Sequence, residues 1–563
     1  MIRALRFKRF INKTFNTPPC KYGNKKVRNI TTTSANGGEK WWKKTLLRTT
    51  IGFAITSSIY VKVSSNYHSK YIIDKEEDKL PKVYDPNEIK SFWKQYPSMA
   101  IDRVFTIVST ITPFLMKLLV SKYIFSEEDK TSKENQQKEY AIEFRHLLQE
   151  LGPCFIKFGQ MLSIRPDVLP PVVVYELQKL CDSVPPFPTP RAIEVIQKEL
   201  NIENINEIYL DVDQDTKPIA AASLGQVYKC RLRSNPDKYV AVKVQRPDMI
   251  RSVSLDLYLL RIYTETVEKM KSMVYFVGLA AKRKSYDVQL LDTFANASYF
   301  ELDYVHEGQN QERIGNELIP RIGKDKMYVP KVYWNHTSRK VLTSEFIDGV
   351  QLAKSDSTVI KRLIPVGVKV YLAQLLDTGF FHSDPHPGNL LVDKQGRLVL
   401  IDFGLCATVA KPDTENMTKA IVHLMSGDME KLLDDAIELG FLPYDVDKTQ
   451  LVPVLEQIYK SASLEINDEE KKIFSRQKIF RSAQRRKRFQ SISKELNMIF
   501  FEYPFTVPEY FALITRALIV LEGIALTGDS QFDIFHASYP YAKDRAVEIF
   551  GLSNVLKILS STI

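Results

Sequence analysis

Three polar residues in the second half of the chain stand at the spacing that phosphoryl transfer from a nucleotide requires. Asp384 and Asn389 are five residues apart, and Asp402 opens an Asp-Phe-Gly triplet after the apolar run Leu398–Ile401. In this chemistry one carboxylate orients or deprotonates the acceptor, while an amide and a second carboxylate hold Mg²⁺ against the phosphates. The apolar run predicts a strand just before Asp402. We therefore predict that Asp384 is catalytic and that Asn389 and Asp402 bind the metal.

A run of small residues upstream predicts the loop that covers the phosphates. Compared with the pattern Gly-x-Gly-x-x-Gly-x-Val, the first two glycines are replaced by Ala220 and Ala222. Alanine lacks the positive-φ freedom of glycine and adds methyl groups beside the phosphates, so a nucleotide should sit differently beneath this loop. The residues expected to contact ATP here are Ala220, Ala221, Ala222, Ser223, Gly225 and Val227.

A lysine and a carboxylate partner on a helix complete the expected ATP site. Lys243 stands in the strand-like run Val240–Val244, where its ammonium group can pair with the α- and β-phosphates. Such a lysine needs a carboxylate partner on a helix, and the segment that follows is long and helical in pattern. Glu307 is the residue that we expect to form this ion pair with Lys243.

A second acidic pair, Glu301 and Asp303, needs a cation from another part of the chain. Upstream, Lys157 and Gln160 share one helical face at the i, i+3 spacing, with Gly159 between them. This upstream helix is therefore the expected source of the cation.

Five motifs thus follow one another along the chain: Lys157-x-Gly159-Gln160, Ala220 to Ser223, Glu301-x-Asp303, Asp384 with Asn389, and Asp402-Phe-Gly. With them, the sequence resembles the UbiB family, the aarF-domain atypical kinases of mitochondria, plastids and bacteria. The resemblance is specific over roughly residues 140–410. It implies an α+β, atypical protein-kinase-like bilobal fold, with a small β-containing N-lobe, a helical C-lobe and an N-terminal helical extension packed over the active site. It also implies that ATP and Mg²⁺ are the cofactors.

The resemblance further implies a regulatory role for the Lys-x-Gly-Gln helices, which in the family lie over the site where a protein substrate would dock. Lys157 would then pair with Glu301 and Asp303, and the regulatory set would be Lys157, Gly159, Gln160, Glu301 and Asp303. The form His382-x-Asp-x-His-Pro-Gly resembles the bacterial and general mitochondrial branches. We therefore expect a fungal-type mitochondrial member of the general branch and not of the coenzyme-Q-biosynthetic branch.

Two departures separate this sequence from protein kinases that phosphorylate polypeptides. Ser383 occupies the position of the arginine in His-Arg-Asp, so the loop lacks a cationic receptor for a phosphorylated activation loop. No Ala-Pro-Glu motif follows Asp402-Phe-Gly. In the same loop, His386 is either a metal ligand or an imidazole that orders the loop, and we favour the second interpretation.

Composition excludes several classes of protein. Hydrophobic residues make up 44% of the 563 residues and charged residues 26%, which indicates a globular chain. The net charge of +11 lies at the N-terminus, since residues 1–65 carry +13 and the remainder −2. This distribution argues against a nucleic-acid partner for the folded body. The five cysteines form no CxxC pair, so we expect small buried side chains and neither disulfides nor a zinc site.

The N-terminus reads as a targeting and anchoring region. Residues 1–38 are basic and free of acids, which fits a mitochondrial transit peptide, the alternative being a solvated basic tail. Residues 39–65 contain the uncharged run Thr49–Val61 behind Trp41 and Trp42, which we interpret as an inner-membrane anchor with the body in the intermembrane space. The alternative is a matrix protein whose short helix packs against the body. A second uncharged run, Val104–Met116, is predicted to be a buried helix.

The remaining boundaries follow from the motifs and from composition. We expect a linker with helices over 66–140, the Lys-x-Gly-Gln helical extension over 141–204, the N-lobe over 205–350 and the C-lobe with its helical C-terminus over 351–563. Pro185–Pro190 reads as a stiff connector. The basic segment Arg476–Arg488 is either a solvated face or a surface that attracts anionic lipid headgroups.

These features lead to one favoured function and one alternative. The favoured function is a Mg²⁺–ATP-dependent atypical kinase or ATPase that acts in inner-membrane lipid or coenzyme Q homeostasis, with membrane lipids, a prenyl-quinone or another lipid as partner. The alternative is a nucleotide-gated lipid-binding or scaffold pseudokinase with little turnover. The retention of Lys243, Glu307, Asp384, Asn389 and Asp402 favours the enzyme.

Overall fold

The computed structural model describes residues 77–124, 130–163, 169–181, 185–276, 287–383, 386–463, 508–529, 532, 534–552 and 555. The predicted transit peptide, the predicted anchor, Asp384 and the basic segment Arg476–Arg488 lie outside the described residues. The chain divides into two compact units. Unit 1 contains residues 1–198, 213–228 and 243–302, and unit 2 contains residues 199–212, 229–242 and 303–563.

Unit 1 is built mainly from helices. They are η1 (Glu77–Lys79), α4 (Pro86–Trp93), α5 (Pro97–Ile124), α6 (Lys130–Leu151), α7 (Pro153–Ser163), α8 (Pro171–Gln178), η2 (Lys179–Cys181), α9 (Thr189–Leu200), α10 (Met249–Phe276) and α11 (Asp287–Glu301). Val253 and Leu257 lie four residues apart on α10 and join a buried apolar cluster that includes Trp93 of α4. The prediction of long helices between Lys243 and Glu301 is confirmed.

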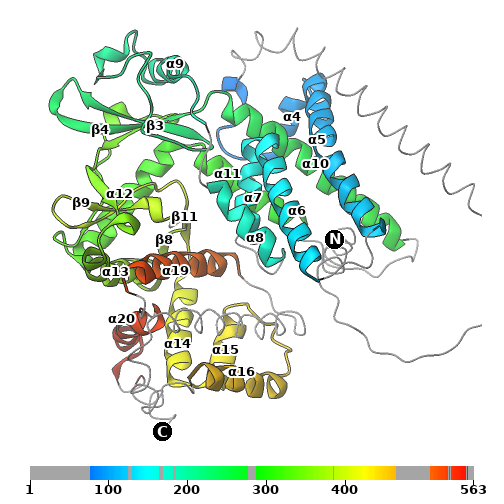
Figure 1. Ribbon diagram of the computed structural model, residues 1–563, viewed down its shortest axis with the longest axis vertical. Coiled ribbons are helices and arrows are strands. Elements are labelled where there is room, and N and C mark those ends of the chain that lie inside the picture. The colour runs from blue at the N-terminus through cyan, green and yellow to red at the C-terminus, as the bar shows by residue number, and fades with distance from the viewer. Residues whose placement is uncertain are drawn as a thin grey trace, which may run out of the picture. The chain divides into compact units, whose positions relative to one another are not determined.

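A buried ion pair fixes α5 within unit 1. Arg103 donates to both carboxylate oxygens of Asp256, at 2.6 and 2.8 Å, and to the backbone oxygen of Leu151 at 2.5 Å. Asp256 is fully buried, so its charge requires this bidentate partner. One arginine therefore ties α5 to α6 and to α10, which lies beside α5 in Figure 1.

The largest sheet has the strand order β1-β3-β4-β6, with β2 paired to β3. Its strands are β1 (Tyr209–Leu210), β2 (Ala220–Ala221), β3 (Gly225–Leu232), β4 (Asn235–Gln245) and β6 (Val341–Glu345). Along β4, Val240, Val242 and Val244 are buried in alternation with less buried neighbours, because successive side chains of a strand point to opposite faces. The strand predicted around Lys243 is thus confirmed.

Unit 2 places two smaller sheets among helices. The sheets have the orders β5-β10-β9-β7 and β11-β8, formed by β5 (Met327–Tyr328), β7 (Gly349–Gln351), β8 (Phe380–His382), β9 (Leu390–Asp393), β10 (Leu398–Leu400) and β11 (Cys406–Thr408). The single-turn helices are η3 (Ile205–Glu207), η4 (Trp334–His336), η5 (Leu352–Lys354) and η7 (Pro387–Asn389), and η6 (Ala373–Thr378) is a π-helical turn. The apolar run before Asp402 is therefore a strand, as predicted.

The longer helices of unit 2 are α12 (Tyr304–Ile322), α13 (Ser357–Leu372), α14 (Lys411–Ser426), α15 (Met429–Glu438), α16 (Lys448–Ser463), α19 (Glu509–Gly528) and α20 (Ile534–Phe550). Helix α13 packs against α19, and both contribute to the main apolar core of the unit. The predominance of helices here agrees with the helical C-lobe that the motifs implied.

One prediction about burial is wrong. The uncharged run Val104–Met116 does form a helix, within α5, and Pro113 does not interrupt it. However, Val104, Val108 and Leu115 are 43%, 45% and 39% exposed, because only the opposite face of α5 packs on the bundle. Within the described residues, Pro97–Leu119 is the single helical stretch long and apolar enough to cross a membrane.

The cysteines follow the prediction only in part. Cys154 and Cys230 are buried and reduced, whereas Cys406 is partly exposed. Burial raises the pKa of the Cys154 thiol, which favours the neutral, unreactive form. Cys20 and the side chain of Cys181 lie outside the described part of the chain.

Candidate functional site

The β9–β10 pair in unit 2 positions both predicted metal ligands. The two strands are antiparallel with Leu390 opposite Leu400, and the amide of Ile401 donates to the backbone oxygen of Asn389 at 3.0 Å. Asn389 immediately precedes β9, and one residue, Ile401, separates the end of β10 from Asp402. The register therefore brings Asn389 and Asp402 to the same end of the sheet.

The backbone of Asp402 is held in an unusual conformation. Its φ is +65°, a left-handed geometry that costs a non-glycine residue roughly 1–2 kcal/mol. The next residue, Phe403, is fully buried, and the ring of His382 packs edge-on against it at 5.7 Å while its Nε2 contacts the backbone oxygen of Asp402. The Asp402 side chain itself is exposed. A buried neighbour thus fixes the turn and leaves the carboxylate accessible to a cation.

Helix α12 places a buried carboxylate beside the Asp-Phe-Gly turn. Glu307 is 3% exposed, and a Cβ on Gly404 would lie 3.5 Å from its Oε2 and 3.6 Å from Oδ1 of Asp402. One turn later on α12, Asn310 donates to the backbone oxygen of Phe403 at 3.1 Å. Sequence reasoning missed this role of Asn310, although its i, i+3 spacing from Glu307 on an expected helix was available.

The chemistry of this cluster suits Mg²⁺. Burial, with a smaller contribution from the nearby carboxylates of Glu307 and Asp402, raises the pKa of the Cys406 thiol. Carboxylate and amide oxygens are the ligands that Mg²⁺ prefers. Among the described residues there is no cluster of three His, Cys, Asp or Glu side chains that could hold a metal. Asn389 and Asp402 would supply two oxygen ligands, and water or phosphate oxygens would have to supply the others.

The catalytic loop is partly described. Asp384 lies outside the described residues, so its role stays a prediction. His386 accepts a hydrogen bond at Nδ1 from the amide of Gly388 at 3.1 Å, a contact expected of an imidazole that orders the loop. Ser383 donates from both its amide and its hydroxyl to the backbone oxygen of Leu405, at 3.0 Å each. The residue at the arginine position is thus a buried structural one.

In unit 1, the alanine loop is a tight hairpin. Ala220 pairs with Val227 and Ala221 with Gln226, and the amide of Ala222 donates to the backbone oxygen of Gly225 at 2.8 Å. Ser223 lies in the turn between β2 and β3. No residue between 220 and 227 is among those of the described chain with positive φ. The backbone therefore accommodates alanine without strain in this conformation.

Arg246 holds the alanine loop and was not identified from the sequence. It donates to the backbone oxygen of Ala222 at 3.1 Å and to that of Pro185 at 2.5 Å, and its guanidinium lies 5.4 Å from the ring centre of Phe187. The predicted stiff connector is thus linked to the loop. Gln226 adds a second link, because it exchanges hydrogen bonds with the backbone of Phe187 at 3.0 and 3.1 Å.

Lys243 lies on β4 and Glu307 on α12, as predicted. Both side chains have interaction partners, and Glu307 is the more buried of the two. Their mutual ion pair stays a prediction.

Helix α7 carries the Lys-x-Gly-Gln motif. Lys157 forms an ion pair with Glu301, the last residue of α11, and the two side chains are 18% and 8% exposed. Gln160 donates to the backbone oxygen of Leu180 at 3.3 Å. A Cβ on Gly159 would lie 2.5 Å from Cδ1 of Leu180, so the glycine permits close helix packing.

The second acidic residue of that pair has a different observed role. Asp303 is the N-cap of α12, and its carboxylate accepts from the amides of Val305 and His306 at 3.0 and 3.4 Å. Such a cap satisfies amides that have no partner inside the helix. Asp303 therefore sets the start of the helix that presents Glu307 and Asn310.

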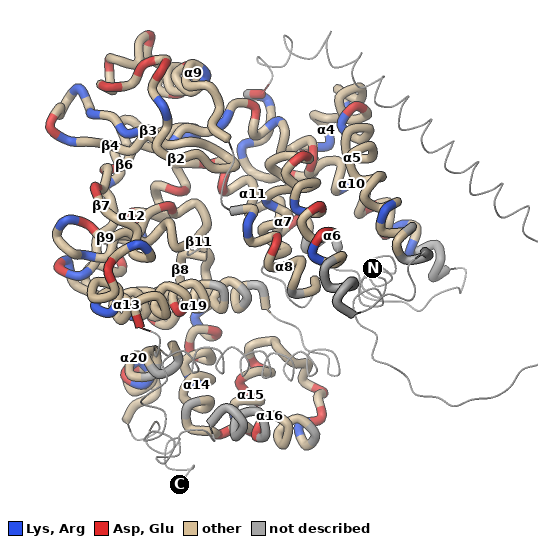
Figure 2. Tube along the Cα trace, in the orientation of Figure 1, with Lys and Arg blue, Asp and Glu red and all other residues tan. Residues whose placement is uncertain are grey.

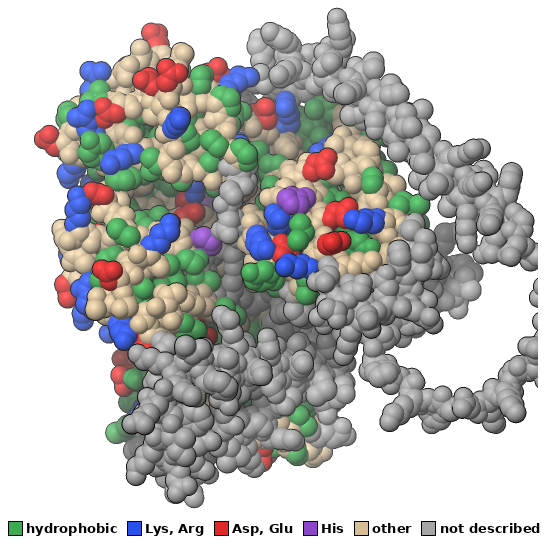
Figure 3. Space-filling model, in the orientation of Figure 1, with side chains coloured by type: hydrophobic (Ala, Val, Ile, Leu, Met, Phe, Trp, Pro, Cys, Tyr) green, Lys and Arg blue, Asp and Glu red, His purple; other side chains and the backbone are tan. Residues whose placement is uncertain are grey.

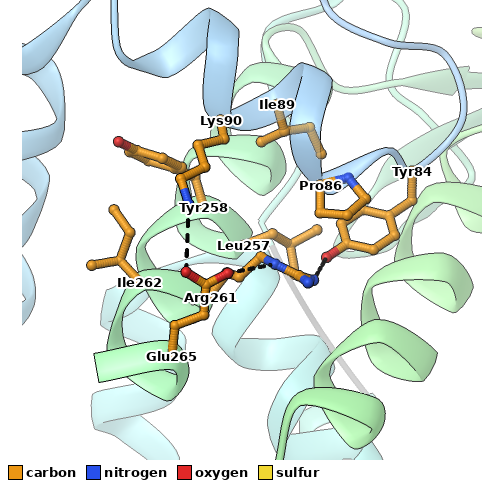
Figure 4. Close-up of a pocket in the computed structure, with 9 residues that line it drawn as sticks. All are labelled: Tyr84, Pro86, Ile89, Lys90, Leu257, Tyr258, Arg261, Ile262 and Glu265. Atoms are coloured by element: carbon orange, nitrogen blue, oxygen red, sulfur yellow. Dashed lines mark hydrogen bonds and ion pairs between the residues drawn. The ribbon is translucent and has the colours of Figure 1, made fainter. Parts of the chain in front are cut away.

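A separate hollow lies between α4 and α10 in unit 1 (Figure 4). Its charged groups are paired: Arg261 contacts Glu265 at 3.1 Å and the Tyr84 hydroxyl at 3.0 Å, and Lys90 contacts Glu265 at 3.5 Å. Burial raises the pKa of Tyr84 to about 12. None of the predicted site residues lines this hollow, which serves packing.

Surface charge shows no single-sign patch on the visible face. Basic and acidic side chains are interspersed over the described residues in Figure 3, and the backbone view in Figure 2 shows the same mixture along unit 2. This agrees with the nearly neutral body inferred from composition.

Comparisons with known proteins match this chain over most of its length. A profile of the ABC1 atypical kinase-like domain matches residues 179–436. The protein ACTIVITY OF BC1 COMPLEX KINASE 3, chloroplastic, of Arabidopsis thaliana is 36% identical over 82% of this chain and 60% of its own length. The uncharacterized protein slr1919 of Synechocystis is 35% identical over 82% of this chain and 76% of its own length. The chain is also similar to a solved structure, the complex of Rv3197 with erythromycin from Mycobacterium tuberculosis. The superposition covers 72% of this chain and 95% of the Rv3197 chain, with 22% identity and a TM-score of 0.40.

The chain thus spans less than two thirds of the length of the plant relative. The α+β, kinase-like bilobal fold expected from the motifs is confirmed. Together, the motifs, the fold and the matched domain show that the chain belongs to the ABC1 family of atypical kinase-like proteins, which includes the aarF-domain and UbiB proteins.

Proposed function

We propose that this protein binds Mg²⁺–ATP and transfers or hydrolyses its terminal phosphate. The observation that supports this most strongly is the placement of Asn389 and Asp402 at one end of the β9–β10 pair, with the Asp402 side chain exposed. A bound Mg²⁺ would neutralise phosphate charge, which is the main requirement of phosphoryl transfer. Asn389 and Asp402 would hold the metal, and Asn310 would steady the turn by its bond to Phe403.

The other site residues have distinct proposed tasks. Lys243 binds phosphate oxygens, and Glu307 holds Lys243 in place. Asp384 accepts the proton of the acceptor hydroxyl or of the attacking water. The alanine loop covers the nucleotide, and Arg246 sets its position through Ala222.

The acceptor that we propose is a lipid or prenyl-quinone-related molecule, or water. Ser383 supports this choice, because it stands where protein kinases have an arginine and is bound to Leu405. This position therefore offers no cation to a phosphorylated activation loop. The proposed location is the mitochondrial inner membrane, with the body in the intermembrane space and a function in lipid or coenzyme Q homeostasis. The basic, acid-free N-terminus and the uncharged run Thr49–Val61 support this location.

Release of phosphate from ATP by the full-length protein tests the proposed activity. It would be measured with and without Mg²⁺ and with and without anionic liposomes, for the parent and for Asp402→Asn. Asp348→Asn is the matched control, since Asp348 is an exposed carboxylate of unit 2 that pairs with Lys394 at 2.6 Å.

We expect Mg²⁺-dependent release in the parent and in Asp348→Asn, and none in Asp402→Asn. Mg²⁺-dependent nucleotide binding without release would favour the scaffold pseudokinase. Equal release by Asp402→Asn and the parent would contradict the metal assignment.

A further inference from the structure

Helix α5 exposes a stripe of apolar side chains along one face. The exposed fractions of Ile101, Val104, Val108, Leu115 and Leu119 are 54%, 43%, 45%, 39% and 43%. The spacings of three, four, seven and four residues keep all five on one side of a helix. From Ile101 to Leu119 the stripe is about 27 Å long at 1.5 Å per residue. We call these five residues the α5 stripe.

The rest of α5 is fixed in the bundle of unit 1. Arg103 is bound by the buried Asp256, and Phe114 is 8% exposed and stacks on Phe144 of α6 at 5.9 Å. A helix held along its length by α6 and α10 does not leave the bundle to cross a membrane without breaking these contacts. The stripe is therefore a surface of a packed helix, of the kind that lies in the plane of a membrane interface.

Large contiguous apolar patches are rare on the surfaces of soluble proteins, and where they occur they mark interaction sites. Between Arg103 and Lys117 the helix has no charged residue. Hydrocarbon is the partner that such an uncharged apolar stripe can contact without polar groups.

The predicted anchor limits how far unit 1 can lie from the membrane. The predicted anchor ends at Val61, and Glu77 is the first described residue. Sixteen residues span at most about 55 Å when fully extended. A bilayer that holds the anchor therefore stays within one protein diameter of unit 1, to which α5 belongs.

We propose that the α5 stripe lies on the bilayer, with its side chains at the boundary between the headgroups and the acyl chains. This proposal rests on the proposed membrane location, and it adds a second contact to the N-terminal anchor. Two membrane signals hold a protein far more firmly than one, and the second one fixes its orientation. The stripe would thus set which face of unit 1 is turned to the lipid.

Photo-crosslinking of the full-length protein in phosphatidylcholine vesicles tests the proposal. The variants Val108→p-benzoyl-Phe and Leu115→p-benzoyl-Phe place the crosslinker on the stripe. Val83→p-benzoyl-Phe is the matched control, because Val83 is also an exposed residue of unit 1, 67% exposed, and precedes α4. Extraction of the same vesicles with alkaline carbonate reports separately whether the N-terminal anchor is inserted.

We expect lipid adducts at positions 108 and 115 and none above background at position 83. Lipid adducts at 108 and 115 support the proposal even if carbonate releases the protein, a result that would count only against the anchor. Adducts between two copies of the chain, or no adducts at either stripe position, would overturn the proposal while an extraction-resistant protein leaves the anchor intact.

Discussion

The replacement Asp402→Gly should separate stability from function at the metal site. Asp402 is held at φ +65°, which an L-residue adopts only at a cost, whereas glycine adopts it freely. The Asp402 side chain is exposed, so its removal leaves no cavity in the core. It also lies near the buried carboxylate of Glu307, across Gly404. Without Mg²⁺, the backbone geometry therefore favours glycine.

The expected gain follows from two opposing contributions. Relief of the left-handed backbone contributes roughly 1–2 kcal/mol, and asparagine and aspartate lie at the low end of that range. The greater freedom of glycine in the unfolded chain costs about 0.4–1 kcal/mol. The difference is a stabilisation of about 0.5 kcal/mol, before any relief of repulsion with Glu307 is added.

Thermal unfolding in EDTA and in Mg²⁺–ADP measures both effects. In EDTA, the Tm of Asp402→Gly should equal or exceed that of the parent, and Mg²⁺–ADP should raise the Tm of the parent alone. Asp248→Gly is the matched control, because Asp248 also has a positive φ, of 62°, but lies at the start of α10. It should keep the response to Mg²⁺–ADP. A clear loss of Tm by Asp402→Gly in EDTA, or an undiminished response to Mg²⁺–ADP, would refute the reasoning.

Four further substitutions test other parts of the structure. Lys157→Ala should change autophosphorylation and abolish biological function, because Glu301 loses its cation, while the helical content seen by circular dichroism should stay unchanged. Full complementation of a deletion by this variant would make Lys157 an ordinary surface residue. Ala222→Gly should shift the affinities for ADP and ATP at a cost in stability of about 1 kcal/mol or less, measured by titration and urea unfolding, and unchanged affinities would contradict tuning by the loop. Tyr371→Phe should leave the Tm unchanged or raised, since the buried Tyr371 hydroxyl has no hydrogen-bond partner within the described residues. Tyr209→Phe should lower the Tm, because the Tyr209 hydroxyl bonds to Thr343 at 2.6 Å. A lower Tm for Tyr371→Phe than for Tyr209→Phe would contradict both expectations.

Local patterns predicted the parts of the site that lie close together in the sequence. Asn389 and Asp402 are separated by one hairpin, so an apolar run and a spacing sufficed to place them at one sheet end. Lys157 and Gln160 follow from helical periodicity alone. The pairing of Lys157 with Glu301 was available only through resemblance to a family, since 144 residues separate them.

Long-range contacts and backbone geometry could not be predicted in this way. Nothing in the sequence marks Arg246 as the residue that joins Ala222 to Pro185, because surface arginines are common and the contact depends on how the connector folds back. The positive φ of Asp402 had no sequence signal either, because asparagine or glycine is the usual residue at such a position.

The burial of α5 was predicted wrongly for a related reason. A segment such as Val104–Met116, which has no charged residue on any side, gives little signal of which face is covered. The contacts of Arg103 and Phe114 are among those that determine this face, and they depend on α10 and α6.

The measurement that tests the central claim most directly is calorimetric titration of ATP into the full-length protein and into Asp402→Asn, with and without Mg²⁺. The parent should bind ATP tightly only when Mg²⁺ is present, and Asp402→Asn should lose this dependence together with most of the affinity, because an amide cannot balance the charge of metal and phosphate. Equal affinities of the two proteins in Mg²⁺, or binding by the parent that ignores Mg²⁺, would contradict the claim that Asn389 and Asp402 form a metal–nucleotide site.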